Sequence, residues 1–351
     1  MTIDGMPADN GKEPFPLLVF RDVTYFPMTW DFTVGKFGWK TAWDDRFGYS
    51  IYTGLVLDRI IYDDEAFLYA EGFSNGEYGI VRFRKDFEGK AEVFTPEQSS
   101  KLREVAAAYG EEPVPETRDT VIQGDSVYYK GTELVNAAAH RAEHPELYNA
   151  VKPADGAVIE YNEKTITSPA GLTVVNLAFR TAKANVANDP DTHTYLIKAG
   201  KAAELAPFNK TIRSYRLSAG GMWLWSSATT STSARSSGIY GLVLWVDNNG
   251  SARLWNNTLQ SGQSRVLRAD PEELMVQAYP GGAESGGGHS SGSGPSRGAY
   301  YILRSDGSFT KIADADAGAF GYVDRQGVWY ELPGADQVTN LSKGISRRFE
   351  P

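Results

Sequence analysis

The segment HRAEH, residues 140–144, has the spacing of a zinc-binding helix. On a continuous helix, His140 and His144 lie one turn apart on the same face and could bind zinc, which leaves Glu143 to activate a water molecule. Pro145 follows directly, and proline biases the residue before it away from helical dihedral angles. An alanine-rich, charged surface helix explains the same letters. We therefore favour the surface helix and expect no bound metal or other cofactor.

The other histidines and the acidic runs are weaker signals. His193 and His289 are expected to lie in loops, where they suggest no Ser/His/Asp grouping. The runs NDPDTH (188–193) and DADAG (314–318) could bind calcium through their carboxylates. Acidic runs of this kind more often form solvated turns, so we favour turns at both places.

Two pairs of adjacent carboxylates, Asp44-Asp45 and Asp63-Asp64, raise the question of glycoside hydrolysis. A glycosidase needs two carboxyl groups that face each other across a cleft, whereas adjacent residues on a strand point to opposite faces. Turns therefore explain both pairs better. The chain also has no nucleophile elbow, phosphate-binding loop or EF-hand loop, so we expect that the protein is not an enzyme.

Four tryptophans are the best candidate for a binding surface. Trp223 and Trp225 share one face of a predicted strand, and Trp245 and Trp255 follow in the next predicted hairpin. Such a set could stack on a sugar or a peptide, but large aromatic side chains between sheets are also ordinary core. We favour the core and keep the aromatic platform as the alternative.

The composition excludes several classes of partner. The 351 residues include 35 Lys and Arg against 44 Asp and Glu, and the net charge of −9 disfavours binding to nucleic acid. The chain has no cysteine, which excludes disulfides and thiolate metal sites. No run reaches the ~18 apolar residues of a membrane span, and the N-terminal segment lacks the basic and apolar regions of a signal peptide.

A weak internal repeat organises most of the chain. Three segments each contain an alternating strand, a tight glycine turn and a second alternating strand: 194–208, 241–257 and 299–315. A short apolar strand precedes each hairpin, and its central residues, Val175, Trp223 and Val276, follow at intervals of 48 and 53 residues. These intervals are close to the ~40–50 residues of a four-stranded propeller blade.

Further copies of the repeat predict a β-propeller of about five to six blades over residues 58–351. Segments 65–94 and 319–341 have the same layout, and a predicted helix near 132–151 interrupts a blade between 121 and 161. Another helix is predicted at 96–110, since both helical segments are rich in Ala, Leu and Glu.

Three insertions fall between the second and third strands of their repeats: 182–194, 228–238 and 281–298. They would project from the same face of the propeller. The last has 13 Gly or Ser among its 18 residues, too few apolar groups to offset the entropy of ordering, so we expect a mobile loop there.

Residues 1–57 predict a separate, small α+β module. The letters VTYFPM (23–28) predict a strand and TWDFTVGKFG (29–38) a short helix that ends at Gly38. The segments WKTAWDD (39–45) and GYSIYTG (48–54) predict a hairpin, and the aromatic side chains between them would form a small core.

This module resembles the copper amine oxidase N-terminal-like domain found in surface and secreted proteins of Gram-positive bacteria. The resemblance covers roughly residues 2–57 and depends on five motifs: TIDGMP (2–7), VTYFPMTW (23–30), FGW (37–39), TAWDD (41–45) and FGYSIYTG (47–54). The domain carries neither copper ligands nor a quinone cofactor precursor, so the resemblance implies no enzyme activity. It implies an exported protein with a non-catalytic module at the cell envelope.

The sequence thus predicts a mainly β, monomeric, exported protein that binds a glycan, another cell-wall component or a protein partner through the loop-bearing face of its propeller. A cytoplasmic protein is the alternative location. Two other functions stay open. The first is a hydrolase, either a metal-dependent one using His140 and His144 or a glycan-processing one with acidic residues near the propeller axis. The second is a structural spacer.

Overall fold

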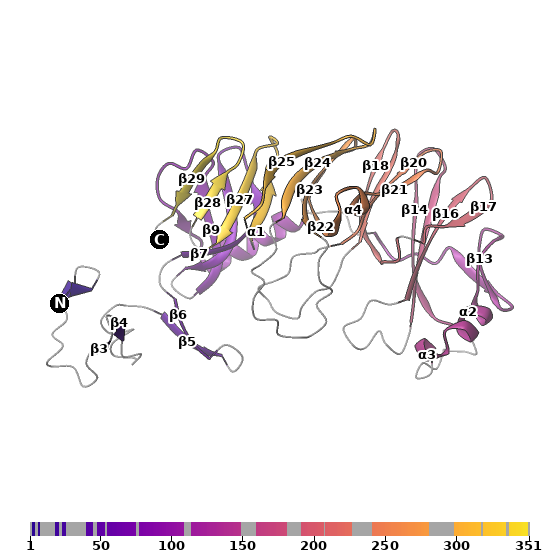
Figure 1. The fold of residues 1–351 in the computed structure, drawn as a ribbon, viewed down its shortest axis with the longest axis horizontal. Coiled ribbons are helices and arrows are strands. Elements are labelled where there is room, and N and C mark those ends of the chain that lie inside the picture. Colours follow the sequence, from indigo (N-terminus) through magenta and orange to yellow (C-terminus); the bar gives the residue numbers. More distant parts are fainter. Residues whose placement is uncertain are drawn as a thin grey trace. The chain divides into compact units, whose positions relative to one another are not determined.

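The computed structural model is mainly β (Figure 1). It describes short strands within the first 52 residues and the ranges 55–74, 77–108, 114–148, 159–180, 191–206, 208–226, 241–280, 298–316, 319–334 and 337–349. The chain divides into two compact units. Unit 1 comprises Met1–Arg103, Gly334–Gln337 and Arg347–Pro351, and unit 2 comprises Glu104–Pro333 and Val338–Ser346. Within the described ranges, no helix is long and apolar enough to cross a membrane.

Four four-stranded sheets follow one another from residue 161 to residue 348, each with its strands in sequence order. The first two contain β14 (Tyr161–Thr167), β15 (Thr173–Phe179), β16 (Asp191–Lys198) and β17 (Lys201–Glu204), then β18 (Ile212–Ser218), β19 (Gly221–Ser226), β20 (Val243–Asp247) and β21 (Ala252–Leu254). The next two contain β22 (Ser261–Ala269), β23 (Glu273–Pro280), β24 (Ala299–Arg304) and β25 (Phe309–Asp314), then β26 (Phe320–Val323), β27 (Trp329–Gly334), β28 (Gln337–Asn340) and β29 (Ile345–Arg348).

These sheets confirm the repeat. Each predicted hairpin is the third and fourth strand of a sheet, and each predicted upstream strand is the second. Gly250 and Gly307 have positive φ in the hairpin turns, as the Asn-Gly and Asp-Gly pairs predict. The insertions lie between second and third strands as expected, except that residues 191–194 of the first belong to the third strand, β16. Nearly all of their residues, including the Gly/Ser-rich loop up to 297, fall outside the described ranges.

Apolar clusters join successive sheets of unit 2 face to face. One contains Val127 and Val175 and joins the β11–β13 sheet to the β14–β17 sheet, and another contains Leu196 and Leu244 and joins the latter to the β18–β21 sheet. Two further clusters continue the series to the β22–β25 and β26–β29 sheets. Because both faces are covered, every residue of β15 and β19 is buried, which explains why both strands are mostly apolar.

The four tryptophans belong to this core. Trp223 and Trp255 are fully buried, and Trp225 and Trp245 are nearly so. The rings of Trp223 and Trp245 lie 4.7 Å apart, and the Trp223 indole N–H donates to the Pro271 carbonyl. The alternative of an exposed aromatic platform at these four residues is therefore wrong, since no face of the set is open to a sugar or peptide.

Buried amides connect one sheet to the next. Asn176, on β15, donates to the carbonyl of Lys210 and accepts from the N–H of Ile212, where β18 begins. Gln277, on β23, makes the same pair of bonds to the Ala319 carbonyl and the Gly321 N–H of the following sheet. The repeat therefore includes a polar link between sheets as well as an apolar one.

The segment predicted as one helix near 132–151 differs in the structure. Its first residues form β13 (Thr132–Asn136), which completes a three-stranded sheet with β11 (Thr120–Gln123) and β12 (Ser126–Tyr129). The helix begins only at the alanine run, as α2 (Ala137–Glu143), and α3 (Pro145–Tyr148) follows. The letters TELVN alternate in a way that suits pairing with β12, and this pairing outweighs their helical propensity. The other predicted helix is confirmed as α1 (Pro96–Ala108).

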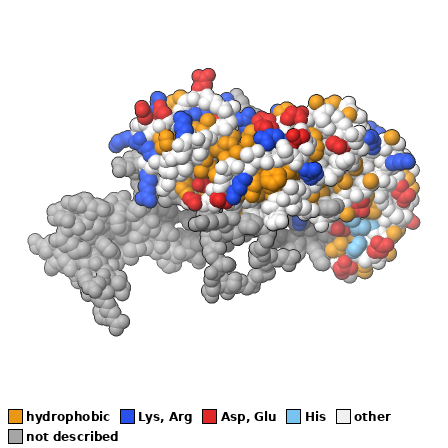
Figure 2. Space-filling model, turned by 45° about the horizontal axis from the view of Figure 1, so that its top comes forward, with side chains coloured by type: hydrophobic (Ala, Val, Ile, Leu, Met, Phe, Trp, Pro, Cys, Tyr) orange, Lys and Arg blue, Asp and Glu red, His pale blue; other side chains and the backbone are white. Residues whose placement is uncertain are grey.

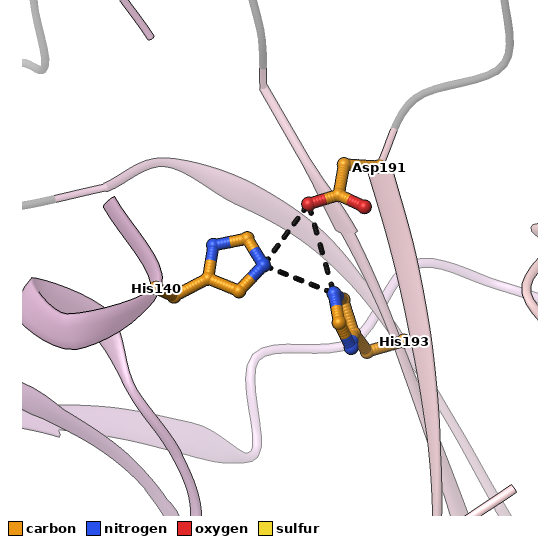
Figure 3. Close-up of side chains that lie close together, drawn as sticks. All are labelled: His140, Asp191 and His193. Carbon is orange, nitrogen blue, oxygen red and sulfur yellow. Dashed lines mark hydrogen bonds and ion pairs between the residues drawn. The ribbon is translucent and has the colours of Figure 1, made fainter. Parts of the chain in front are cut away.

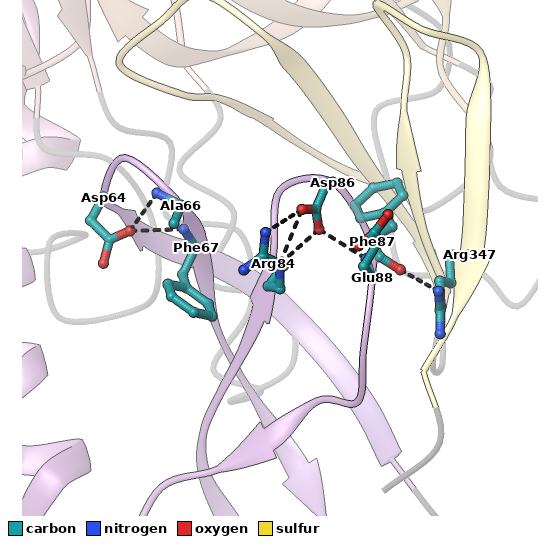
Figure 4. Close-up of polar contacts among 8 residues, drawn as sticks. All are labelled: Asp64, Ala66, Phe67, Arg84, Asp86, Phe87, Glu88 and Arg347. Atoms are coloured by element: carbon teal, nitrogen blue, oxygen red, sulfur yellow. Dashed lines mark hydrogen bonds and ion pairs between the residues drawn. The ribbon is translucent and has the colours of Figure 1, made fainter.

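Unit 1 contains a sheet of β10 (Glu92–Val93), β9 (Glu77–Arg84), β8 (Phe67–Ser74) and β7 (Leu55–Asp63), in that order. Asp64 caps the turn after β7 by accepting from the N–H groups of Ala66 and Phe67 (Figure 4). Its neighbour Asp63 pairs with Lys85 at 2.8 Å. The interpretation as turn residues is therefore confirmed for Asp64, whereas Asp63 is the last residue of β7.

Polar contacts also hold the turn after β9 and the C-terminal segment of unit 1. Asp86 pairs with Arg84 and accepts from the N–H of Glu88, and the Arg347 guanidinium donates to the Phe87 carbonyl (Figure 4). The Phe349 ring packs 5.9 Å from that of Phe87, so C-terminal residues cover this turn.

The N-terminal segment contains β1 (Thr2–Ile3), β2 (Met6–Pro7), β3 (Leu18–Phe20), β4 (Val23–Tyr25), β5 (Lys40–Asp44) and β6 (Gly48–Tyr52). The predicted hairpin is confirmed, because β5 pairs with β6 in antiparallel register. The predicted helix at 29–38 and Asp45 lie outside the described residues. Strand β7 runs without a break through the predicted domain boundary at residue 57.

Candidate functional site

Helix α2 positions His140 at the edge of unit 2. Asn136 caps the helix, since its side chain accepts from the Ala139 N–H at 2.8 Å. The helix ends after Glu143 because His144, which precedes Pro145, takes φ −125° and ψ 51°. His140 is only 6% exposed, and its ring packs on that of Phe179 of β15 at 4.9 Å. The imidazole is therefore held against the face of the β14–β17 sheet.

Strand β16 supplies the residues that meet His140. Asp191 and His193 are two positions apart, so they point to the same face of the strand. Tyr195 and Ile197 continue this face and belong to the cluster that packs against the β11–β13 sheet. The prediction that His193 lies in a loop is therefore wrong, because the strand begins at Asp191.

The three side chains converge on one point (Figure 3). His140 Nε2 lies 3.0 Å from His193 Nε2 and 3.0 Å from Asp191 Oδ2, and the third distance, from His193 Nε2 to Asp191 Oδ2, is 3.6 Å. Asp191 Oδ2 is buried, yet neither imidazole reaches it with the geometry of a hydrogen bond. Two ring nitrogens thus face a carboxylate oxygen that has no hydrogen-bond donor.

The outer nitrogens of both rings are held by side chains of the surrounding elements. Glu204 Oε1, from β17, lies 2.6 Å from His193 Nδ1, and because a carboxylate only accepts, Nδ1 carries the proton. The Nε2 atom of neutral His193 is then a bare acceptor. The Tyr148 hydroxyl, from α3, lies 2.9 Å from His140 Nδ1. Where this hydroxyl accepts, the Nε2 atom of His140 is bare as well.

Charge and burial act in opposite directions at this cluster. Burial alone raises the pKa of Asp191, but the adjacent imidazoles of His140 and His193 outweigh burial and hold the pKa well below its usual range. Burial alone lowers the pKa of His193, but Asp191 and Glu204 outweigh it, and the net shift is upward. The site therefore favours positive charge at its centre.

The geometry fits a tetrahedral metal ion. An ion about 2.0–2.1 Å from all three inner atoms, the usual zinc distance, would lie about 0.8 Å out of their plane. An ideal tetrahedral ion lies about 0.7 Å from the plane of any three of its ligands. Two imidazoles and one carboxylate suit zinc and similar transition metals, whereas calcium prefers oxygen ligands. The earlier alternative of calcium binding at 188–193 therefore does not suit the described residues of that run.

The structure places the residues of the HRAEH motif in different environments. His140 is in the cluster, but the residues it meets come from β16, 51 and 53 residues further along the chain, rather than from its own helix. Glu143 is exposed at the end of α2. The side chain of His144 is 46% exposed, and its ring lies 5.0 Å from that of His140. His289 lies outside the described residues.

Solvent reaches the neighbourhood of the cluster. The space-filling view shows histidine side chains at the surface in one place, beside acidic side chains (Figure 2). The side chains of Asp191 and His193 are 27% and 21% exposed. An ion could therefore enter the site without unfolding of the sheet.

A second buried titratable cluster surrounds Glu331 of β27. Glu331 is 4% exposed, and its Oε1 atom accepts from the Tyr300 hydroxyl at 2.8 Å and from the Asp316 N–H at 2.9 Å. Burial, together with the nearby Asp316, raises the pKa of Glu331. The folded protein therefore holds this proton more tightly than the unfolded chain does.

This shift predicts a pH-dependent effect of Glu331→Gln. In the wild type, stability from this group is fully present below the unfolded pKa and is lost as pH rises toward the raised folded pKa. The glutamine keeps the acceptor oxygen without the charge, so the variant should be more stable than the wild type at pH 7 and equal to it below about pH 4. Urea denaturation at both pH values measures this. A surface change, Glu143→Gln, should show no such difference, and an equal gain at both pH values would contradict the prediction.

No protein-family model matches the chain, and no curated protein matches it. Function is therefore inferred from the geometry of the His140, Asp191 and His193 cluster.

Proposed function

We propose that this protein binds a divalent transition-metal ion, with zinc as the best fit, through His140, Asp191 and His193. The convergence of two imidazole Nε2 atoms on the undonated Asp191 Oδ2 carries the proposal. In many zinc sites the second nitrogen of each metal-binding imidazole is held by a hydrogen-bond partner that orients the ring. Glu204 would have this role for His193, and Tyr148 would have it for His140. The metal would tie α2 to β16 and so fix the helical segment on the face of its sheet.

Metal binding is tested on the purified full chain. Zinc should bind with one ion per chain, and at a free concentration of 100 times Kd it should stabilise the protein by about 2.7 kcal/mol. His140→Ala should abolish both effects, whereas Glu143→Ala, on the same helix but exposed, should leave both unchanged. Calorimetry and thermal unfolding with and without zinc measure them. Equal zinc binding by the wild type and His140→Ala would refute the site.

We propose further that the successive sheets are blades of a β-propeller with five to six blades, preceded by the copper amine oxidase N-terminal-like module. In this proposal the protein is exported and monomeric, and it binds a cell-wall glycan or a surface protein through the face that carries the three insertions. The repeated four-stranded order and the face-to-face clusters support the propeller. Small-angle scattering tests it, because a closed ring and an open row of sheets differ in their maximum dimension.

A metal-dependent hydrolase is the second candidate function. The partial exposure of Asp191 and His193 favours it, because a catalytic zinc site keeps a position open for water. Hydrolysis of ester, peptide and glycan model substrates by the zinc-loaded protein, lost in His193→Ala, would select this function over metal binding alone.

A further inference from the structure

His144 lies beside the cluster without being part of it. Its backbone N–H still donates to the His140 carbonyl at 3.1 Å, which keeps it one turn beyond His140 although its own dihedral angles are not helical. The His144 ring lies 5.0 Å from the His140 ring, and the His193 ring lies 4.9 Å from the His140 ring. Two imidazoles therefore lie at nearly the same distance from His140.

The His144 side chain is also the most available nitrogen donor near the site. It is 46% exposed, and its ion pair with Glu146, which is 57% exposed, spans 3.8 Å, which makes that contact weak. The nearby side chains of Glu204 and Tyr148 are less available, because Glu204 hydrogen-bonds to His193 and Tyr148 hydrogen-bonds to His140. Rotation of an exposed side chain about its own bonds disturbs no core packing.

We propose that His144 supplies the fourth ligand of the metal ion, so that three histidines and Asp191 enclose it. The proposal rests on the metal site proposed above and adds its coordination number. The His140, Asp191 and His193 triangle leaves one tetrahedral position. His144, whose ring lies 5.0 Å from that of His140, is the remaining described histidine that could fill it. A site closed in this way has no position left for water, so the ion stabilises the α2–α3 segment and does not activate a substrate.

The test compares His144→Ala with Glu146→Ala. Removal of one of four ligands should weaken zinc binding at least as much as loss of an outer partner, by about 10–100-fold, in competition with a chelator. Glu146→Ala removes only the weak partner of His144, so its affinity should equal or exceed that of the wild type. Cobalt should give the strong visible absorption of a tetrahedral ion in the wild type and in Glu146→Ala, and a weaker spectrum in His144→Ala.

Different results overturn the two proposals. If His144→Ala binds zinc as the wild type does and gives the same cobalt spectrum, the fourth-ligand proposal is wrong and the site is open. If His140→Ala also binds zinc normally, the metal site itself is wrong. Because His144 is exposed and outside the apolar core, His144→Ala should fold normally, and circular dichroism confirms that before binding is measured.

Discussion

Replacing Trp223 with alanine is expected to lower the free energy of unfolding by about 3–5 kcal/mol, the usual cost of truncating a buried tryptophan. Trp223 has no exposed surface, and its ring lies 4.7 Å from Trp245 and 6.3 Å from Trp255. The change opens a cavity between the β18–β21 and β22–β25 sheets and leaves the Pro271 carbonyl without its donor. Chemical denaturation followed by circular dichroism measures the loss.

A graded series separates the cavity from other causes. Trp223→Phe keeps part of the ring volume and should cost less than Trp223→Ala. Val121→Ala, on the exposed strand β11, should change stability by no more than about 0.5 kcal/mol. If Trp223→Ala left stability unchanged, the buried contacts of Trp223 would contribute nothing to the packing of these two sheets.

The spacing of apolar strands and glycine turns was enough to predict the repeated sheets, because those features are local. Strand pairing across a short hairpin and turns such as Asp306-Gly307 depend on residues that are neighbours in the sequence. The choice between core and platform for Trp223 depended on whether a second sheet covers the strand. Whether a second sheet covers the strand depends on how one repeat packs on the next. The apolar residues of β19 favour the core but do not show this packing.

The cluster of His140, Asp191 and His193 could not be predicted in full, because its members are far apart in the sequence. His140 meets His193 across 53 residues, after the β11–β13 and β14–β17 sheets have packed together. The motif HRAEH drew attention to the right helix but gave no sign of Asp191 and His193, the residues that meet His140. One signal was available in the letters: Asp191 and His193 alternate at the start of a strand-like run, and this places both on one face.

Replacing Asn176 with leucine is expected to cost about 2–4 kcal/mol, because buried polar groups that lose a hydrogen-bond partner are left desolvated without compensation. Asn176 is 1% exposed, and its amide donates to Thr194 Oγ1 at 2.8 Å and to the Lys210 carbonyl at 3.1 Å. Its Oδ1 accepts from the Ile212 N–H at 3.1 Å. Leucine has the same number of side-chain heavy atoms in the same branched arrangement, so the change leaves no cavity and removes the hydrogen bonds. Urea denaturation of both proteins measures the difference.

The control for this prediction is Asn162→Leu, which makes the same chemical change at an exposed position of the neighbouring strand β14. It should alter stability by no more than about 0.5 kcal/mol. Equal effects of the two changes would mean that the link from Asn176 to the start of β18 contributes nothing to the packing of these sheets. A loss of stability in Asn176→Leu but not in Asn162→Leu is the expected result. A similar loss in Gln277→Leu, at the link between β23 and β26, would show that buried amides hold successive sheets in a fixed register, which apolar contact alone does not specify.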